Sequence, residues 1–177
     1  ISRSDWSSDV CSSDLLGNTR ALVNAALLAA VYAAITYMTK PISFGAVQFR
    51  ISEALCILPV FTVSAVPGLF VGCFLANFLS GAAPLDIVFG SLASLIGAYG
   101  TYRLRDKGYL ASLPPIVSNA LIIPFVLRYG YGIEGSLPFF GLTVGIGEII
   151  AIGILGNMLR LALLRYGNKL FPEGGIA

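Results

Sequence analysis

Long apolar segments, separated by short polar or charged ones, constrain this chain more than any other feature. A helix that spans the hydrocarbon core of a membrane needs about 20 predominantly apolar residues. The composition agrees, because 56% of the 177 residues are hydrophobic and 11% are charged, against roughly 25% charged residues in a soluble domain. A soluble fold of this size could not cover so much apolar surface, so we predict an all-α integral membrane protein.

Six transmembrane helices are predicted from the lengths of the apolar segments and the residues that separate them. Lys40-Pro41 ends the first segment, and Pro67-Gly68 divides the second from the third. The second and third segments are about 16 residues each, so we expect them to be sheltered or to lie beside a cavity. The predicted spans are residues 19–39, 51–66, 67–83, 84–103, 113–130 and 137–165.

Positive charge predicts the orientation, since short cytoplasmic loops of membrane proteins carry an excess of Lys and Arg. With six spans, both termini lie on the same side. That side would hold seven basic residues and the opposite side three, which predicts that both termini are cytoplasmic. The seven are Arg20, Arg103, Arg105, Lys107, Arg160, Arg165 and Lys169, and the three are Lys40, Arg50 and Arg128.

Residues 1–14, ISRSDWSSDVCSSD, differ in character from the rest of the chain. They are rich in Ser and Asp and lack the basic and apolar regions of a signal peptide. The string resembles a translated sequencing-adaptor fragment, so we expect it to be non-native or disordered. Residues 15–177 are then expected to form one six-helix membrane domain.

Small residues at four-residue spacing predict close contacts between helices, because they let helix backbones approach each other in lipid. The first predicted helix has two adjacent stripes of this kind. A face so smooth could pack internally or dock on another membrane subunit. The stripes are Ala25, Ala29 and Ala33, and beside them Ala26, Ala30 and Ala34.

Polar residues within the apolar segments are the candidates for a binding site, because charges in hydrocarbon are costly and usually face a cavity or a partner. They come from different predicted helices, and most lie toward the predicted outer half, as a pocket that opens outward requires. Aromatic residues nearby in the sequence could hold a flat ligand, namely Phe44, Phe49, Tyr129 and Tyr131. The candidates are Arg50, Glu53, Asn77, Asp86, Asn119, Glu148 and Phe49.

Most of these residues also have a purely structural interpretation. Asp86 lies at a predicted helix start and could only complement the helix dipole. Arg50 could simply pair with Glu53, three residues further on, and the two asparagines could bridge helices. Glu148 is the hardest to explain in this way, because its own helix offers no basic neighbour near it.

Several classes of chemistry are disfavoured by what the sequence lacks. It has no histidine, the commonest general base, and its three cysteines have no CxxC spacing. It has neither a Gly-x-Ser-x-Gly nucleophile elbow nor a Gly-x-x-x-x-Gly-Lys-Ser/Thr phosphate loop. We therefore expect no enzyme activity, ATP hydrolysis, metal or cofactor, and the net charge of +2 is too small to suggest nucleic acid.

Motifs in the first half of the chain resemble those of a known family. They are Phe49-Arg-Ile-Ser-Glu-Ala-Leu55, Leu58-Pro59, Gly68-Leu-Phe-Val-Gly72 with Asn77, and Asp86-Ile-Val-Phe-Gly90. Over residues 20–167 the chain resembles the QueT family, which are substrate-binding S components of energy-coupling factor (ECF) transporters assigned to queuosine precursors. The resemblance implies a multi-pass protein of the bacterial plasma membrane, with six helices and cytoplasmic termini.

The ligand that the resemblance implies is a 7-deazaguanine such as preQ0, preQ1 or queuine. Its guanine-like edge offers an N–H and an NH2 that one carboxylate can accept together, and its carbonyl needs a donor. We expect Glu148 to bind that edge and Asn119 the carbonyl side. Arg50, Glu53 and Asp86 would line or gate the outer mouth.

The same resemblance implies partner subunits. These are a transmembrane coupling subunit, on which an alanine face of the first helix would dock, and two ATPases that supply energy. The ligand would be captured outside and released inside after the chain reorients on the coupling subunit.

Three alternatives stay open at this point. The ligand could be a vitamin, because pocket shape decides such specificity. The chain could be a stand-alone, ion-coupled secondary transporter, with Glu148 as its proton or sodium site. It could also be a scaffold subunit that binds nothing, which would be favoured if the polar residues are paired with one another.

Overall fold

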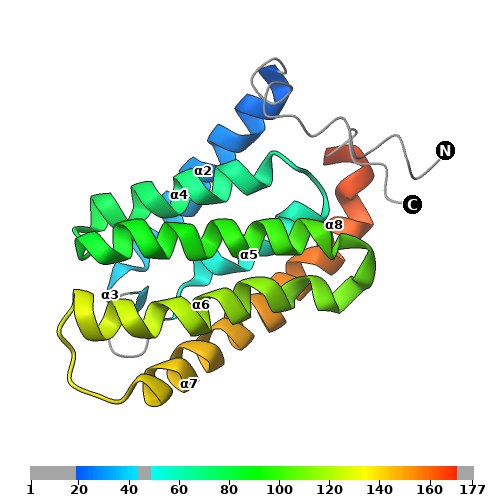
Figure 1. Ribbon diagram of the computed structural model, residues 1–177. Coiled ribbons are helices and arrows are strands. Elements are labelled where there is room, and N and C mark those ends of the chain that lie inside the picture. The colour runs from blue at the N-terminus through cyan, green and yellow to red at the C-terminus, as the bar shows by residue number, and fades with distance from the viewer. Residues whose placement is uncertain (1–18, 44–48, 171–177) are drawn as a thin grey trace.

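The structure, a computed structural model, describes residues 19–43 and 49–170, and every regular element in these ranges is helical (Figure 1). The all-α prediction is therefore confirmed for the described residues, and residues 1–14 lie outside them. The α-helices are α2 (Thr19–Met38), α3 (Lys40–Ser43), α4 (Ala65–Ser80), α5 (Ser91–Arg103), α6 (Leu113–Phe125), α7 (Leu137–Glu148) and α8 (Asn157–Leu170). The 3₁₀ segments are η1 (Ile51–Val60) and η3 (Arg105–Ser112), and the π segments are η2 (Asp86–Gly90), η4 (Val126–Gly130) and η5 (Ile149–Gly156).

Several of these elements join end to end into longer rods. η2 continues into α5, α6 into η4, and α7 through η5 into α8. Successive rods run back and forth along the bundle (Figure 1). Among the described residues, three stretches are long and apolar enough to cross a membrane, namely Thr19–Met38, Arg105–Gly130 and Leu137–Arg165.

The second predicted helix, residues 51–66, differs from the prediction. It is a 3₁₀ helix of 10 residues, Ile51–Val60, and most of its side chains are buried. The next helix already begins at Ala65, so Pro67 falls in its first turn and does not divide two helices. A proline in a first turn removes no helical hydrogen bond, which explains the difference. The expected shelter is confirmed for η1, whereas α4 exposes apolar side chains such as Phe78.

The contact between α2 and α4 accounts for one of the two alanine stripes. A Cβ at Gly68 of α4 would lie 2.8 Å from the backbone oxygen of Ala25, and one at Gly72 would lie 3.0 Å from Ala29 Cα. Ala29 and Ala33 are buried. The stripe Ala25, Ala29 and Ala33 is therefore part of the interior and not a free docking face. The stripe Ala26, Ala30 and Ala34 is exposed.

We expect Gly72→Ala to destabilise the protein by about 1–3 kcal/mol, the usual cost of overpacking a tight contact. The added methyl group would lie 2.9 Å from Tyr32 Cβ and 3.0 Å from Ala29 Cα, and neither atom can rotate away. Gly145→Ala is the matched control, since its Cβ would have Ala120 Cβ at 3.8 Å as its nearest neighbour. Unfolding in detergent micelles measures both variants, and equal losses would contradict the packing argument.

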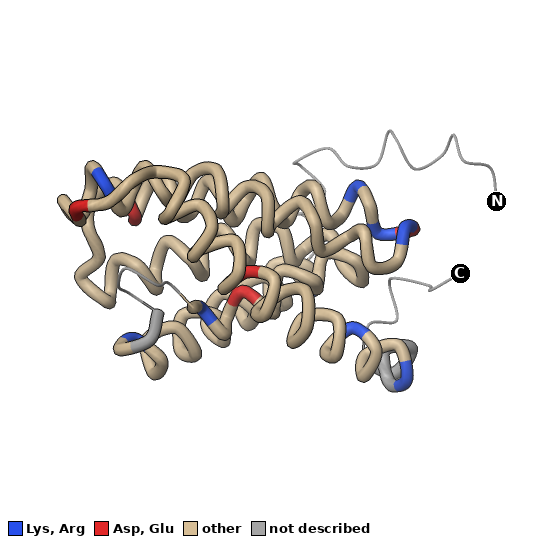
Figure 2. Tube along the Cα trace, turned by 90° about the horizontal axis from the view of Figure 1, so that it is seen from below, with Lys and Arg blue, Asp and Glu red and all other residues tan. Residues whose placement is uncertain are grey.

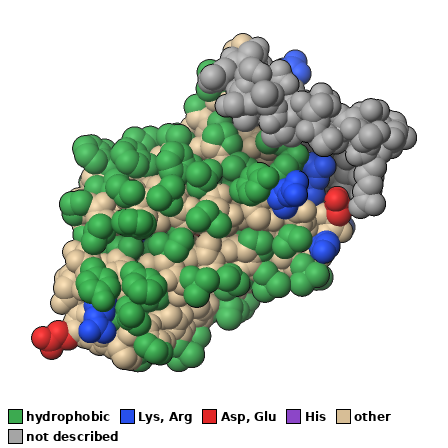
Figure 3. Space-filling view, viewed as in Figure 1, with side chains coloured by type: hydrophobic (Ala, Val, Ile, Leu, Met, Phe, Trp, Pro, Cys, Tyr) green, Lys and Arg blue, Asp and Glu red, His purple; other side chains and the backbone are tan. Residues whose placement is uncertain are grey.

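The surface of the bundle is apolar along its length and charged at its ends (Figure 2, Figure 3). Leu27, Phe78 and Leu121 are 59%, 63% and 64% exposed. Lipid chains cover such side chains without cost, whereas water does not. The distribution of charge and apolar surface is that of a membrane-embedded bundle.

Candidate functional site

Charged side chains are buried in the interior of the bundle. Arg50, Glu53, Asp86 and Glu148 are between 0% and 6% exposed. Acidic positions also appear midway along the tube in Figure 2, away from the charged ends. Burying so many charges is costly unless each has partners, so their contacts decide what this region can do.

Arg50 and Asp86 form a buried ion pair. Arg50, just before η1, places its Nη2 atom 3.0 Å from Oδ2 of Asp86 in the first turn of η2. The Tyr131 hydroxyl donates to the same Oδ2 at 2.8 Å, and the Asn77 amide donates to the Asp86 backbone oxygen at 3.0 Å. Burial and the Asp86 charge raise the pKa of Tyr131, so this hydroxyl stays protonated. Asp86 therefore does more than complement a helix dipole, and the partner of Arg50 lies on a distant segment.

Glu53 is held by uncharged donors. The Tyr32 hydroxyl of α2 donates to its Oε1 atom, and the Cys56 thiol donates to Oε2 at 2.9 Å. Tyr32 is fully buried although α2 is otherwise rich in alanine. Sequence reasoning missed Tyr32. The available signal was a lone tyrosine between Ala29 and Ala33 on a helix face that must pack tightly.

Glu148 and Asn119 meet in the interior, as the sequence hypothesis required them to do. The Asn119 amide of α6 donates to Oε1 of Glu148 at 2.9 Å. Glu148 is the last residue of α7, and η5 begins directly after it. Because η1 packs against η5, Glu53 of η1 lies close enough to interact electrostatically with Glu148. Asn119 and Asn77 both bridge helices, so the structural interpretation of the asparagines is also correct.

Three acceptor oxygens in this region lack a hydrogen-bond donor among the described residues. They are Asn77 Oδ1, Asp86 Oδ1 and Glu148 Oε2. An unsatisfied buried acceptor costs about 1–3 kcal/mol, and nearly all such groups in folded proteins have a partner. The orphan oxygens therefore mark where an additional donor would bind. We call the following set the interior polar cluster: Tyr32, Arg50, Glu53, Asn77, Asp86, Asn119, Tyr131 and Glu148.

The chain is similar to known bacterial transporters. A model of the QueT transporter family matches residues 22–165. The chain belongs to this family. It is also 34% identical over 77 residues to the "Queuosine precursor transporter QueT" of Lactococcus lactis subsp. cremoris (strain MG1363). That match covers 42% of this chain and 45% of the relative, so it spans less than half the length of either protein.

No solved structure matches this QueT-family chain. Family membership and the apolar helices together make it a multi-pass transport protein of the bacterial plasma membrane. The predicted family and localisation are thereby confirmed.

The aromatic residues of the QueT-family chain lie in different surroundings. Phe49 packs against the hydrophobic core around η1 and α4. Tyr131 contacts the interior polar cluster, whereas Tyr129 is 67% exposed. Tyr32 and Tyr131 are thus the described aromatics that hydrogen-bond to the buried carboxylates, while Phe44 lies outside the described residues.

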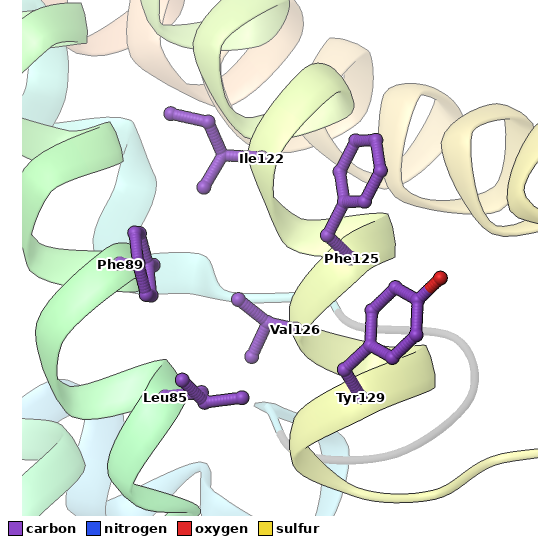
Figure 4. Close-up of a pocket in the computed structure, with 6 residues that line it drawn as sticks. All are labelled: Leu85, Phe89, Ile122, Phe125, Val126 and Tyr129. Atoms are coloured by element: carbon purple, nitrogen blue, oxygen red, sulfur yellow. The ribbon is translucent and has the colours of Figure 1, made fainter.

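Two hollows on the surface do not coincide with the interior polar cluster. The apolar one, of about 290 Å³, lies between the η2–α5 and α6–η4 rods (Figure 4). Its lining residues are Leu85, Phe89, Ile122, Phe125, Val126 and Tyr129. The second lies in the loop around residues 128–135. Neither hollow is lined by the buried polar groups, which contact one another. Among the described residues, no group of three or more His, Cys, Asp or Glu side chains could hold a metal ion.

Proposed function

We propose that this chain is the membrane-embedded binding subunit for uptake of a queuosine precursor, a 7-deazaguanine such as preQ0, preQ1 or queuine. Membership of the QueT transporter family and the name of the 34% identical relative support the substrate class. The observation that carries the site is the set of buried acceptor oxygens without donors among the described residues. A ligand rich in N–H groups supplies those donors.

The ring edge of a 7-deazaguanine suits Glu148. That edge carries an N–H and an NH2 side by side, which one carboxylate accepts in a charge-assisted pair. Oε2 of Glu148 has no donor among the described residues, and Oε1 accepts from Asn119. When the ligand binds, the Asn119 amide would turn from Glu148 to the ring carbonyl and leave both carboxylate oxygens to the ring edge.

The other cluster residues would surround the ring. Arg50, Glu53 and Asp86 would line the mouth, and Phe49 and Tyr131 would offer aromatic faces. Their internal hydrogen bonds hold the polar groups in place before the ligand arrives. A site built in this way rejects ligands that leave its buried groups unpaired.

Six spans with both termini in the cytoplasm form part of the proposal. Basic residues lie at the start of α2, in the connection between α5 and α6, and in α8: Arg20, Arg103, Arg105, Lys107, Arg160 and Arg165. The excess of Lys and Arg in cytoplasmic loops supports this orientation.

Separate subunits would supply the energy, as in ECF transporters. A coupling subunit and two ATPases are proposed as partners. The exposed stripe Ala26, Ala30 and Ala34 supports docking, because small side chains let another transmembrane helix approach closely. The buried stripe on the same helix is left out of this proposal.

Calorimetry on the detergent-purified protein tests the function. Ligands are preQ1, preQ0, queuine, guanine, riboflavin and biotin. We expect a deazaguanine to bind at least 100-fold more tightly than either vitamin. Tight binding of a vitamin would overturn the substrate, and no binding of any ligand would favour the scaffold interpretation. Uptake that persists in cells without the ATPase subunits would instead indicate a secondary transporter.

A further inference from the structure

The interior polar cluster carries more negative than positive charge. It contains three carboxylates, those of Glu53, Asp86 and Glu148, and the guanidinium of Arg50. Their formal charges sum to −2 when all three carboxyl groups are ionised, as three negative charges and one positive charge. Arg50 is the only buried Lys or Arg among the residues whose side chains are described.

The position of the excess charge follows from the contacts. Arg50 forms its ion pair with Asp86, so one carboxylate has a cationic partner at 3.0 Å. The donors to Glu53 and Glu148 are a phenol, a thiol and an amide, which are uncharged. Neutral donors do not cancel the charge of a carboxylate, and Arg50 acts on Glu53 and Glu148 only from beyond its ion pair with Asp86, so these two carboxylates are less fully compensated than Asp86.

Two of the three orphan oxygens belong to residues that touch each other. The Asn77 amide donates to the Asp86 backbone, and a Cβ at Gly90 would lie 2.6 Å from Asp86 Oδ1 and 3.1 Å from Asn77 Nδ2. Glycine at position 90 thus keeps this side of Asp86 free of any side chain. Asp86 Oδ1 and Asn77 Oδ1 have acceptor capacity to spare, which suits a donor-only group such as an ammonium.

We propose that the interior polar cluster selects ligands that carry an ammonium group, so that preQ1, with its 7-aminomethyl group, binds in preference to preQ0, with its 7-cyano group. This inference rests on the function proposed above, in which Glu148 binds the ring edge. An alkylamine is protonated at neutral pH, as the lysine side chain is. The ammonium supplies three donors to the orphan acceptors and offsets part of the negative charge, whereas a nitrile only accepts hydrogen bonds.

The first test compares three ligands that share one ring. Calorimetry measures preQ1, preQ0 and 7-methyl-7-deazaguanine, which is close to preQ1 in shape but has no charge. We expect preQ1 to bind at least tenfold more tightly than each neutral ligand. If preQ1 and the neutral ligands bind equally, or if preQ0 binds best, the charge inference is overturned while the proposed function stands. If none of the three binds and queuine does not bind either, both fail.

A pair of variants separates the buried charge from net charge. Glu53→Gln removes one negative charge from the cluster, and Glu134→Gln removes one from an exposed loop position. We expect Glu53→Gln to reduce the ratio of preQ1 to preQ0 affinity by about tenfold, equivalent to about 1.4 kcal/mol. Glu134→Gln should leave the ratio unchanged. Equal effects of the two variants would overturn the inference. If Glu53→Gln does not fold, the comparison of the three ligands on the wild-type protein decides.

Discussion

Arg50→Met should destabilise the protein by about 3–5 kcal/mol, because it leaves the buried Asp86 carboxylate without its cationic partner. Among the described residues, Oδ2 of Asp86 would keep only the Tyr131 hydroxyl as a donor, and Asp86 itself is 0% exposed. Equilibrium unfolding in mixed detergent micelles measures the loss. This pair joins the start of η1 to η2, so the loss affects the interior of the whole bundle.

Two further variants test whether the charge itself is responsible. Adding Asp86→Asn to Arg50→Met removes the isolated charge and should recover at least half of the lost stability. Arg128→Met is the control, because Arg128 is exposed and its Nη1 atom lies 3.4 Å from the Gly135 carbonyl oxygen. Its effect should stay within about 0.5 kcal/mol. The ion-pair argument fails if Arg50→Met costs no more than Arg128→Met.

Glu148→Gln is expected to weaken deazaguanine binding by at least 100-fold. A carboxylate accepts both donors of the ring edge, whereas an amide offers one acceptor and turns its own NH2 toward the other donor. Loss of a charge-assisted bidentate pair of this kind costs about 3 kcal/mol, which corresponds to a factor of more than 100 in affinity. Calorimetry with preQ1 and queuine measures the change.

The fold should survive this substitution, since glutamine retains the Oε1 oxygen that accepts from Asn119. Unfolding of Glu148→Gln in detergent checks that expectation. Binding as tight as that of the parent would show that Glu148 does not read the ring edge. The site would then have to be assigned to the other buried carboxylates.

The helical segments could be predicted because hydropathy and helix-breaking residues act locally. The boundary near Pro67 was misplaced, because a proline marks the first turn of a helix as readily as its end. The 3₁₀ form of η1 and the three π segments could not be predicted, since a count of apolar residues says nothing about which carbonyl each N–H selects. Packing of each segment against its neighbours decides between these forms.

The site was predictable as a set of residues but not as a set of contacts. Membrane burial of a charge is costly wherever it occurs, so Glu148 and Asp86 stand out in the sequence. The pairing of Arg50 depends on how η2 lies against η1, and sequence proximity pointed to Glu53 instead. Tyr32 does not stand out among the alanines around it in the sequence. Its hydroxyl is identified as part of the site only by its hydrogen bond to Glu53, which depends on how α2 packs against η1.

The enclosed η1 helix constrains how the chain is assembled during synthesis. At about 2.0 Å per residue, its 10 residues reach roughly 20 Å, less than the thickness of the hydrocarbon core. It carries Glu53, follows Arg50 directly, and packs against η5, which the ribosome makes much later. We therefore expect residues 51–60 to be kept away from lipid until most of the chain has been made, and the rod that contains η5 to close the polar interior when it enters the membrane.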